Sequence, residues 1–211
     1  MNSSLSNIVT PLLNWYHTYA RTLPWRQSPS AYHIWVSEIM LQQTRVEAVK
    51  AYYNRFTAEL PTIADLAACQ EEKLLKLWEG LGYYNRVRNM QKAAIQVMTQ
   101  YHGEMPHSYE ELLKLPGIGS YTAGAVASIA YGIPVPAVDG NVLRVITRMT
   151  ANYGDITKQN TKDEITKQLQ AIMPKQHAGD FNQALMELGA TVCIPNGEPQ
   201  CFVCPVQTYC K

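Results

Sequence analysis

The hydrophobic residues of this chain recur every three or four positions, which is the period of an amphipathic α-helix. Four segments show the pattern clearly, and we expect each to be helical: Leu74–Leu81, Val87–Tyr101, Val142–Met149 and Phe181–Val192. Glycines at 80 and 82 should break the first of these helices. Two patterns typical of capping boxes, Ser108-x-x-Glu111 and Thr161-x-x-Glu164, predict the starts of two further helices.

Strand signals are confined to Ile133–Val138, where two prolines exclude a central β-strand. We therefore predict an all-α fold. Proline-containing segments at Leu23–Arg26 and Ile133–Pro136 are expected to separate groups of helices. This division predicts two helical lobes with a cleft between them. One lobe comprises residues 30–134, and the other comprises residues 1–29 together with residues 135–211.

The composition is that of a globular protein. Apolar residues make up 46% and charged residues 17% of the 211 positions, which allows a sizeable core and excludes a wholly disordered chain. No apolar run approaches the ~20 residues of a membrane-spanning helix. The start, Met1-Asn2-Ser3-Ser4, lacks the pattern of a secretory signal, so we expect a cytoplasmic protein without membrane contact. The net charge of +1 neither indicates nor excludes a nucleic-acid partner.

Two carboxylates stand alone in long stretches without other acids. Glu38 is the only acid among residues 1–46, and Asp139 is the only acid among residues 112–154. A carboxylate among apolar and basic neighbours tends to be desolvated unless it is exposed, and desolvated acids are candidates for chemistry. A helix cap or an exposed side chain is the alternative explanation for each of them.

The segment Leu115-Pro116-Gly117-Ile118-Gly119 predicts a tight turn between two helices. The following Ser120 is expected to cap a second helix that is rich in small residues. Glycines let backbone N–H groups approach an anion closely, and the start of a helix adds its dipole. The pattern indicates a helix-hairpin-helix that binds a DNA phosphate without reading the sequence. An ordinary helix–helix turn is the alternative.

Four of the five cysteines lie near the end of the chain, at Cys193, Cys201, Cys204 and Cys210. Four thiolates so close in sequence are able to surround one metal centre, and we favour an iron–sulfur cluster. Zinc is the competing interpretation, although zinc sites of four cysteines usually contain two short Cys-x-x-Cys pairs and this segment has one. Disulfide bonds are a third interpretation of these cysteines. The histidines at 17, 33, 102, 107 and 177 show no ligand spacing.

Taken together, these motifs resemble the helix-hairpin-helix DNA glycosylases with an iron–sulfur cluster, and most of all the adenine DNA glycosylases (MutY type). The resemblance extends over nearly the whole chain. It rests on the hairpin, the cysteine cluster and four further motifs: Leu23–Arg26, Trp35–Thr44, Gly80–Arg86 and Val138–Val145.

The resemblance implies a role for each matching residue in removing adenine from duplex DNA. Glu38 would be the general acid that protonates N7 of a flipped adenine. Asp139 would stabilise the oxocarbenium-like sugar and could add to it covalently, with Tyr121 and Asn141 holding its surroundings. A free glutamate has a pKa of about 4.3, so Glu38 would need a raised pKa to stay protonated. Asp139 must stay ionised, as in other two-carboxylate glycosidases.

The resemblance also implies DNA contacts and a cofactor. Trp25, Arg26 and Gln183 would line the adenine pocket, while Gln43, Thr44 and Tyr83 would lie beside the opposite base. The remaining predicted DNA contacts are Arg86, Gly117, Ile118 and Gly119. The four clustered cysteines would bind one 4Fe-4S cluster. The implied protein is a monomeric, monofunctional base excision repair enzyme of the bacterial cytoplasm, acting at the nucleoid on adenine opposite 8-oxoguanine or guanine.

Other functions remain open from the sequence. Endonuclease III-type enzymes, which remove oxidised pyrimidines, have a nucleophilic lysine where this chain has Tyr121, and without that amine no Schiff base forms. A DNA-binding iron–sulfur module without chemistry, or a zinc-stabilised interaction protein, would not require Glu38 and Asp139. The sequence departs from the family pattern in having seven residues, rather than six, between Cys193 and Cys201. It also stops at Lys211, before the C-terminal domain that recognises 8-oxoguanine in the family, which is expected either of a catalytic-domain fragment or of a naturally minimal form.

Overall fold

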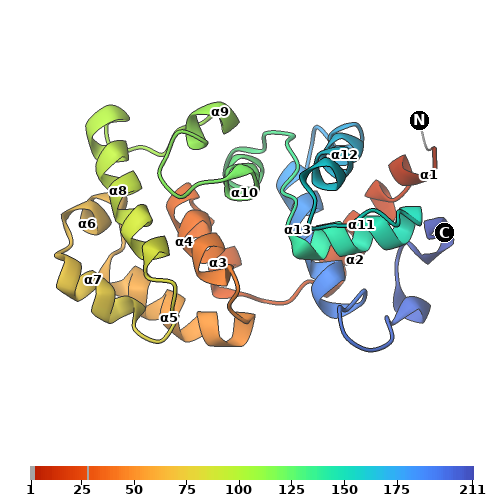
Figure 1. Cartoon of the computed structure of the whole chain (residues 1–211), viewed down its shortest axis with the longest axis horizontal. Helices are drawn as coiled ribbons and strands as arrows, with labels where there is room; N and C mark the ends of the chain where they lie inside the picture. The colour runs from red at the N-terminus through yellow and green to blue at the C-terminus, as the bar shows by residue number, and fades with distance from the viewer. Residues whose placement is uncertain (1–2, 28) are drawn as a thin grey trace. The chain divides into compact units, whose positions relative to one another are not determined.

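The computed structural model describes residues 3–27 and 29–211, and within these ranges the secondary structure is entirely helical. The prediction of an all-α fold is therefore confirmed. The chain divides into two compact units (Figure 1). Unit 1 contains Met1–Arg21 and Gly132–Lys211, and unit 2 contains Thr22–Tyr131. None of the described helices is long and apolar enough to cross a membrane.

Unit 2 is one continuous segment of the chain. Its helices are α3 (Pro24–Gln27), α4 (Ala31–Leu41), α5 (Val46–Glu59), α6 (Ile63–Ala68), α7 (Glu71–Trp78), α8 (Asn85–Gln100), α9 (Tyr109–Leu112) and α10 (Ser120–Tyr131). Helix α4 packs against α10 and α5, and α6 packs against α8. The short α3 belongs to this unit because Trp25 is buried edge-on against Tyr53, with the ring centroids 5.5 Å apart. Residues 22–27 thus lie with the middle of the chain rather than with its ends, where we had expected them.

Unit 1 is built from both ends of the sequence. It contains α1 (Ser3–Ser6), α2 (Val9–Tyr19), α11 (Gly140–Thr150), α12 (Gln159–Gln170), α13 (Ala178–Thr191) and the short 3-10 helices η1 (Cys201–Val203) and η2 (Gln207–Tyr209). Helix α13 packs against both α2 and α11 (Figure 1). Leu12, Ile146, Phe181 and Leu185 are among the fully buried residues of the resulting core.

The helix starts only partly follow the predicted caps. Ser108 does cap α9, since its hydroxyl accepts a hydrogen bond from the Glu111 backbone N–H at 3.2 Å. The predictions that Thr161 and Ser120 cap helices were wrong. Helix α12 begins two residues before Thr161, which places that residue inside the helix, and Ser120 is the first residue of α10. The Gly119 carbonyl accepts the first helical bond, from the Ala123 N–H at 2.9 Å, so a bare glycine precedes this helix.

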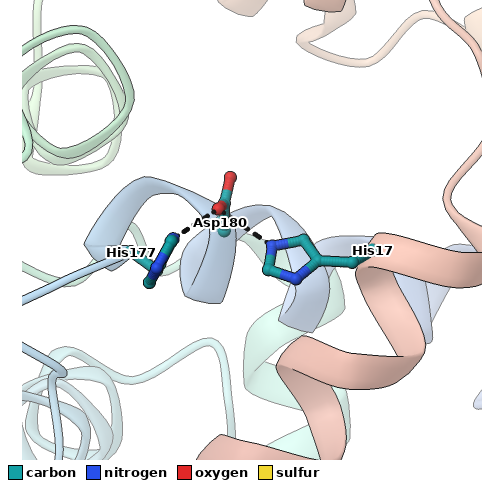
Figure 2. A group of neighbouring side chains, drawn as sticks. All are labelled: His17, His177 and Asp180. Carbon is teal, nitrogen blue, oxygen red and sulfur yellow. Dashed lines mark hydrogen bonds and ion pairs between the residues drawn. The ribbon is translucent and has the colours of Figure 1, made fainter.

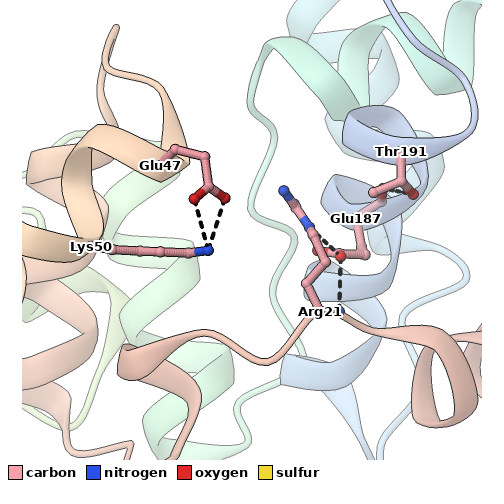
Figure 3. Close-up of polar contacts among 5 residues, drawn as sticks. All are labelled: Arg21, Glu47, Lys50, Glu187 and Thr191. Atoms are coloured by element: carbon pink, nitrogen blue, oxygen red, sulfur yellow. Dashed lines mark hydrogen bonds and ion pairs between the residues drawn. The ribbon is translucent and has the colours of Figure 1, made fainter.

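Ion pairs in the two units differ greatly in burial (Figure 3). In unit 1, Arg21 donates from Nε and Nη2 to the two carboxylate oxygens of Glu187, at 2.6 and 3.0 Å. The Glu187 side chain is 1% exposed, so this bidentate pair has little competition from water. In unit 2, Lys50 pairs with Glu47 at 2.8 Å, but the Glu47 side chain is 79% exposed, so the pair adds little stability. Only the first pair anchors a chain segment to a helix of the core.

Candidate functional site

Glu38 lies on the most buried helix of unit 2. Every residue of α4 from Tyr32 to Met40 is buried except His33, and Glu38 itself is 6% exposed. The α4 helix begins after Ser30, whose side chain accepts a hydrogen bond from the His33 backbone N–H. The Tyr121 hydroxyl, in the first turn of α10, donates a hydrogen bond to Oε2 of Glu38. We had expected Tyr121 to hold the surroundings of Asp139, whereas this hydrogen bond places its phenol directly on the buried Glu38 carboxyl group.

Asp139 lies in unit 1, at the start of α11. Its Oδ1 accepts a hydrogen bond from the Val142 backbone N–H at 2.8 Å, and its Oδ2 accepts one from Asn141 Nδ2 at 2.7 Å. Asp139 is therefore a helix N-cap, so the cap that we gave as an alternative explanation is present. Burial raises the pKa of Asp139 above its usual value, and these two donors together with the charge of Arg144 offset only part of that rise. The donors favour the ionised form of a carboxylate in a poorly hydrated position.

A second layer of contacts holds Asn141 in place. Arg144 Nη2 donates to Asn141 Oδ1 and to the Gly189 carbonyl oxygen, both at 2.8 Å. Helices α11 and α13 meet here so closely that a Cβ atom on Gly189 would lie 2.6 Å from the Asn141 Cβ. Neither Arg144 nor Gly189 was proposed as a site residue. The positively charged Arg144 beside Asn141 was a visible signal, but the role of Gly189 depends on a helix contact that the sequence does not reveal.

The predicted hairpin is present between α9 and α10, and its two glycines differ. Gly117 has a left-handed φ of 76°, and an added Cβ would lie 2.8 Å from the Asn89 Cβ, so the fold itself requires glycine there. Gly119 has no positive φ, and a Cβ there would meet nothing within 4 Å. Its exposed position leaves the backbone open to a ligand. Ile118 is 5% exposed, so only its backbone is available for the predicted DNA contact.

Arg86 supports two loops of unit 2. Its Nη1 donates to the carbonyl oxygens of Ile39 at 2.9 Å and Gln42 at 2.6 Å, and its Nη2 donates to those of Leu81 and Gly82. The guanidinium thus joins the end of α4 to the loop after α7. We had predicted Arg86 as a DNA contact, but the structure commits its terminal nitrogens to the protein backbone.

Each of the two loops presents a residue in a left-handed conformation directly after a carbonyl that Arg86 binds. Gln43 has a φ of 58° and is exposed, and Tyr83 has a φ of 49° and is 65% exposed. A positive φ is uncommon for residues other than glycine and costs about 1 kcal/mol or more. The Arg86 hydrogen bonds offset this strain, so Arg86 is a positioning residue for both side chains.

The other predicted pocket and DNA residues are distributed over both units. Trp25 is 7% exposed, so most of its ring is occupied by the core of unit 2, and Arg26 follows it on α3 as a partly exposed side chain. Thr44 lies just after Gln43 and donates weakly to the Gln42 carbonyl oxygen at 3.4 Å. Gln183 is half-buried on α13 of unit 1.

The four C-terminal cysteines surround one cavity of about 440 Å³ in unit 1. All are free thiols, which argues against the disulfide interpretation. Burial raises the pKa of Cys204, and the three neighbouring cysteines raise it further, although a backbone hydrogen bond at Val206 lowers it. Four adjacent thiolates therefore need a compensating cation. The cavity and its donors fit a metal centre with four sulfur ligands.

Two arginines of α11 hold the first of these cysteines. Arg148 Nη1 lies 3.3 Å from Cys193 Sγ and donates to the Ile194 carbonyl oxygen at 2.9 Å. Arg144 Nε donates to the Cys193 carbonyl oxygen at 3.0 Å. Because Arg144 also contacts Asn141, the cysteine loop is connected to Asp139 through a short chain of hydrogen bonds.

Comparison with known proteins gives consistent matches. A family described as "HhH-GPD superfamily base excision DNA repair protein" matches residues 36–175. The chain is 46% identical over 209 residues to "Adenine DNA glycosylase" of Mus musculus, covering 95% of this chain and 40% of that protein. It is 42% identical over 203 residues to the protein of the same name from Buchnera aphidicola subsp. Baizongia pistaciae, covering 95% and 56%. The chain thus spans roughly half the length of these relatives, or less.

Two solved structures share the architecture of this chain over its full length. One is a thermostable thymine-DNA glycosylase, with a TM-score of 0.88 and 27% identity, covering 100% of this chain and 96% of that one. The other is the endonuclease III of a non-covalent complex with DNA, with a TM-score of 0.82 and 26% identity, covering 100% and 95%.

The two hairpin glycines should respond differently to alanine. Gly117→Ala is expected to lower the free energy of unfolding by about 1–3 kcal/mol, through backbone strain and the Asn89 contact. Gly119→Ala should change it by less than about 0.5 kcal/mol but weaken duplex DNA binding about tenfold, equivalent to one lost hydrogen bond. Urea unfolding and DNA titration measure the two effects. Unchanged DNA affinity in Gly119→Ala would remove the hairpin from the DNA-binding surface.

Arg86→Lys should loosen both loops, because one ammonium group is unable to reach carbonyls on both sides. We expect a loss of about 1.5–3 kcal/mol in unfolding free energy, and faster hydrogen exchange at residues 42–44 and 81–83. Arg88→Lys is the matched control, since Arg88 is an exposed residue of the same helix in a surface pair with Glu71. Equal exchange rates in the two variants would contradict the positioning role.

Proposed function

Because this chain belongs to the HhH-GPD superfamily of base excision DNA repair proteins, we propose that it is a monofunctional adenine DNA glycosylase. The reaction would be hydrolysis of the bond between adenine and its sugar, with adenine opposite 8-oxoguanine or guanine as the substrate. The names of its curated relatives support this choice of base.

The observation that carries the proposal is the buried pair of Glu38 and Tyr121. Glu38 is 6% exposed and accepts the Tyr121 hydroxyl at a position where an endonuclease III-type enzyme would place a lysine. A phenol does not form a Schiff base, so strand cleavage by that route is not available here. A buried carboxyl group beside a phenol is instead suited to donating a proton to a leaving base.

In this mechanism Glu38 protonates N7 of the adenine, which leaves poorly as an anion. Asp139 remains ionised and stabilises the positive charge that develops on the sugar, as the second carboxylate does in sugar hydrolysis. The hydrogen bonds from Val142 and Asn141 favour that ionised form. A water molecule then completes the hydrolysis.

The adenine must first leave the duplex, at a cost of a few kcal/mol. Tyr83 is a suitable side chain to fill the vacated stack, because it is exposed and Arg86 holds the carbonyl groups of the two residues that precede it. Gln43 would lie beside the opposite base, and Trp25, Arg26, Thr44 and Gln183 would complete the adenine pocket and DNA contacts. Gly117, Ile118 and Gly119 would bind a phosphate through backbone N–H groups.

We further propose that Cys193, Cys201, Cys204 and Cys210 hold one 4Fe-4S cluster. The support is their common cavity and the raised pKa values of Cys204 and Cys210, which a cationic centre would offset. When bound, the cluster would supply a rigid centre for the C-terminal loop. The Arg148 contact to Cys193 would stabilise the thiolate form of that ligand.

Single-turnover base release tests the proposed activity. The duplexes carry adenine opposite 8-oxoguanine, adenine opposite guanine, thymine opposite guanine, and thymine glycol opposite adenine. We expect release of adenine without strand cleavage. Release of thymine would instead indicate the activity named for the thermostable structural neighbour. Nicking at thymine glycol would indicate an endonuclease III-type enzyme.

Glu38→Gln should lower the rate of adenine release by ~10²- to 10⁴-fold while DNA affinity is kept, because the amide has no proton to donate. Glu47→Gln is the matched control, since this exposed glutamate lies on the next helix of the same unit.

Asp139→Asn should also lower the rate of adenine release. The variant should keep the stability of the wild-type protein, because asparagine is an equally good N-cap. Normal turnover of either site variant would contradict its assigned role.

Cys204→Ser should abolish the visible absorbance of the purified chain, because the cluster would lose one of its four ligands. Cys69→Ser is the control, since Cys69 lies in unit 2, away from the cavity. A colourless wild-type protein containing stoichiometric zinc would favour the zinc interpretation instead.

A further inference from the structure

Two exposed histidines and one aspartate meet on the surface of unit 1 (Figure 2). His17 Nε2 lies 3.0 Å from Asp180 Oδ2, and His177 Nδ1 lies 3.1 Å from the same oxygen. All three potential ligand atoms lie within 4.8 Å of one another. The histidines show no ligand spacing in the sequence, because His17 and Asp180 are 163 residues apart.

The three side chains of this cluster are positioned by two packed helices, α2 and α13. His17 is in the last turn of α2, while Asp180 is in the first turn of α13 and His177 immediately precedes that helix. Leu12 and Tyr16 of α2 and Phe181 and Ala184 of α13 are buried in one core directly beneath. The spacing of the three side chains is therefore set by the fold, without requiring a bound ion.

The backbone of His177 adds a second sign of a specialised position. It has a φ of 62° and a ψ of 29°, the left-handed conformation that usually costs a non-glycine residue about 1 kcal/mol or more. His177 precedes α13 but makes no side-chain cap hydrogen bond to it. Its ring is turned toward Asp180 instead, and its centroid lies 5.7 Å from that of His17 (Figure 2).

We propose that His17, His177 and Asp180 form a surface site for a divalent transition-metal ion such as Zn²⁺. Two imidazole nitrogens and one carboxylate oxygen are a ligand set that zinc accepts, with the remaining position open to water or to a ligand. In a tetrahedral site with bonds of about 2.1 Å, ligand atoms lie about 3.4 Å apart, so small side-chain rotations suffice. Mg²⁺ and Ca²⁺ prefer ligands that are all oxygen and are not expected to bind.

The competing explanation is a hydrogen-bonded cluster in which Asp180 Oδ2 accepts from both rings. Both arrangements use the same atoms, but only the metal site requires both imidazoles to be unprotonated at the nitrogen facing the carboxylate. They therefore differ in their response to zinc. The metal would join the end of α2 to the start of α13, which goes beyond the proposed glycosylase activity and does not depend on it.

Zinc titration of the full chain, prepared without a histidine tag, tests the proposal by competition with a chromophoric chelator. The cysteine cavity is a second place where zinc could bind, so the comparison is made between variants that all keep the four cysteines. His17→Ala and Asp180→Asn should each lose one zinc equivalent, or bind it at least ~10-fold more weakly, since even outer-shell changes cost that much.

His102→Ala is the matched control, because His102 is also exposed and left-handed, with a φ of 54°, but lies in unit 2. It should bind zinc like the wild type, and added Mg²⁺ should not compete. On the wild-type chain, zinc should shift the ring NMR signals of His17 and His177 and leave those of His102 unchanged. Equal zinc binding by wild type, His17→Ala and Asp180→Asn, or unshifted His17 and His177 signals, would overturn the proposal.

Discussion

Helix α4 has almost no solvent-facing side, and the carboxyl group of Glu38 is buried together with the apolar residues around it. A buried acid is costly unless it is protonated or receives hydrogen bonds, and Tyr121 supplies one such hydrogen bond. The hairpin starts α10 at Ser120, which brings Tyr121 onto Glu38, and Arg86 fixes the carbonyl groups at the end of α4. The turn that would bind DNA and the acid that would act on the base are thus parts of one packing arrangement.

In unit 1, the carboxylate of Asp139 is surrounded by hydrogen-bond donors. In the proposed mechanism Asp139 would have to remain charged while half-buried, and its position at a helix start provides a backbone N–H group that favours the charged form. Asn141, Arg144 and the Gly189 carbonyl form a supporting layer behind it. The two carboxylates therefore have opposite surroundings, one an apolar helix with a phenol and the other a set of donors. In two-carboxylate enzymes, such a difference in surroundings gives the two acids different roles.

Much of this arrangement was predictable, because it depends on short-range patterns. The helical class, the hairpin and the isolation of Glu38 and Asp139 could be read from hydrophobic periodicity, glycine spacing and charge distribution. The capping patterns failed at Ser120 and Thr161, since α10 begins with Ser120 itself after a glycine, and α12 begins two residues before Thr161, which is buried inside the helix. The boundary near residue 30 shifted to residue 22 because Trp25 is buried against Tyr53.

What could not be predicted depends on contacts between distant segments. Arg86 looked like a DNA-binding cation, yet its direction is decided by five carbonyl groups exposed at the ends of other elements. Gly189 looked like an ordinary helical glycine until α11 was placed against it. His17 and His177 show no common pattern because they come from opposite ends of the chain. None of these relations has a local sequence signal.

The division of the chain between the two units also affects the order in which the protein is made. Unit 2 is continuous, so all of its helices are available once residue 131 has left the ribosome. The core of unit 1 needs α2 together with α11 and α13, and its cysteine cavity is complete only when Cys210 has been synthesised. The apolar face of α2 therefore lacks its partner helices until α13 has been synthesised. During that interval its uncovered apolar surface is prone to aggregation, as in other incompletely folded chains.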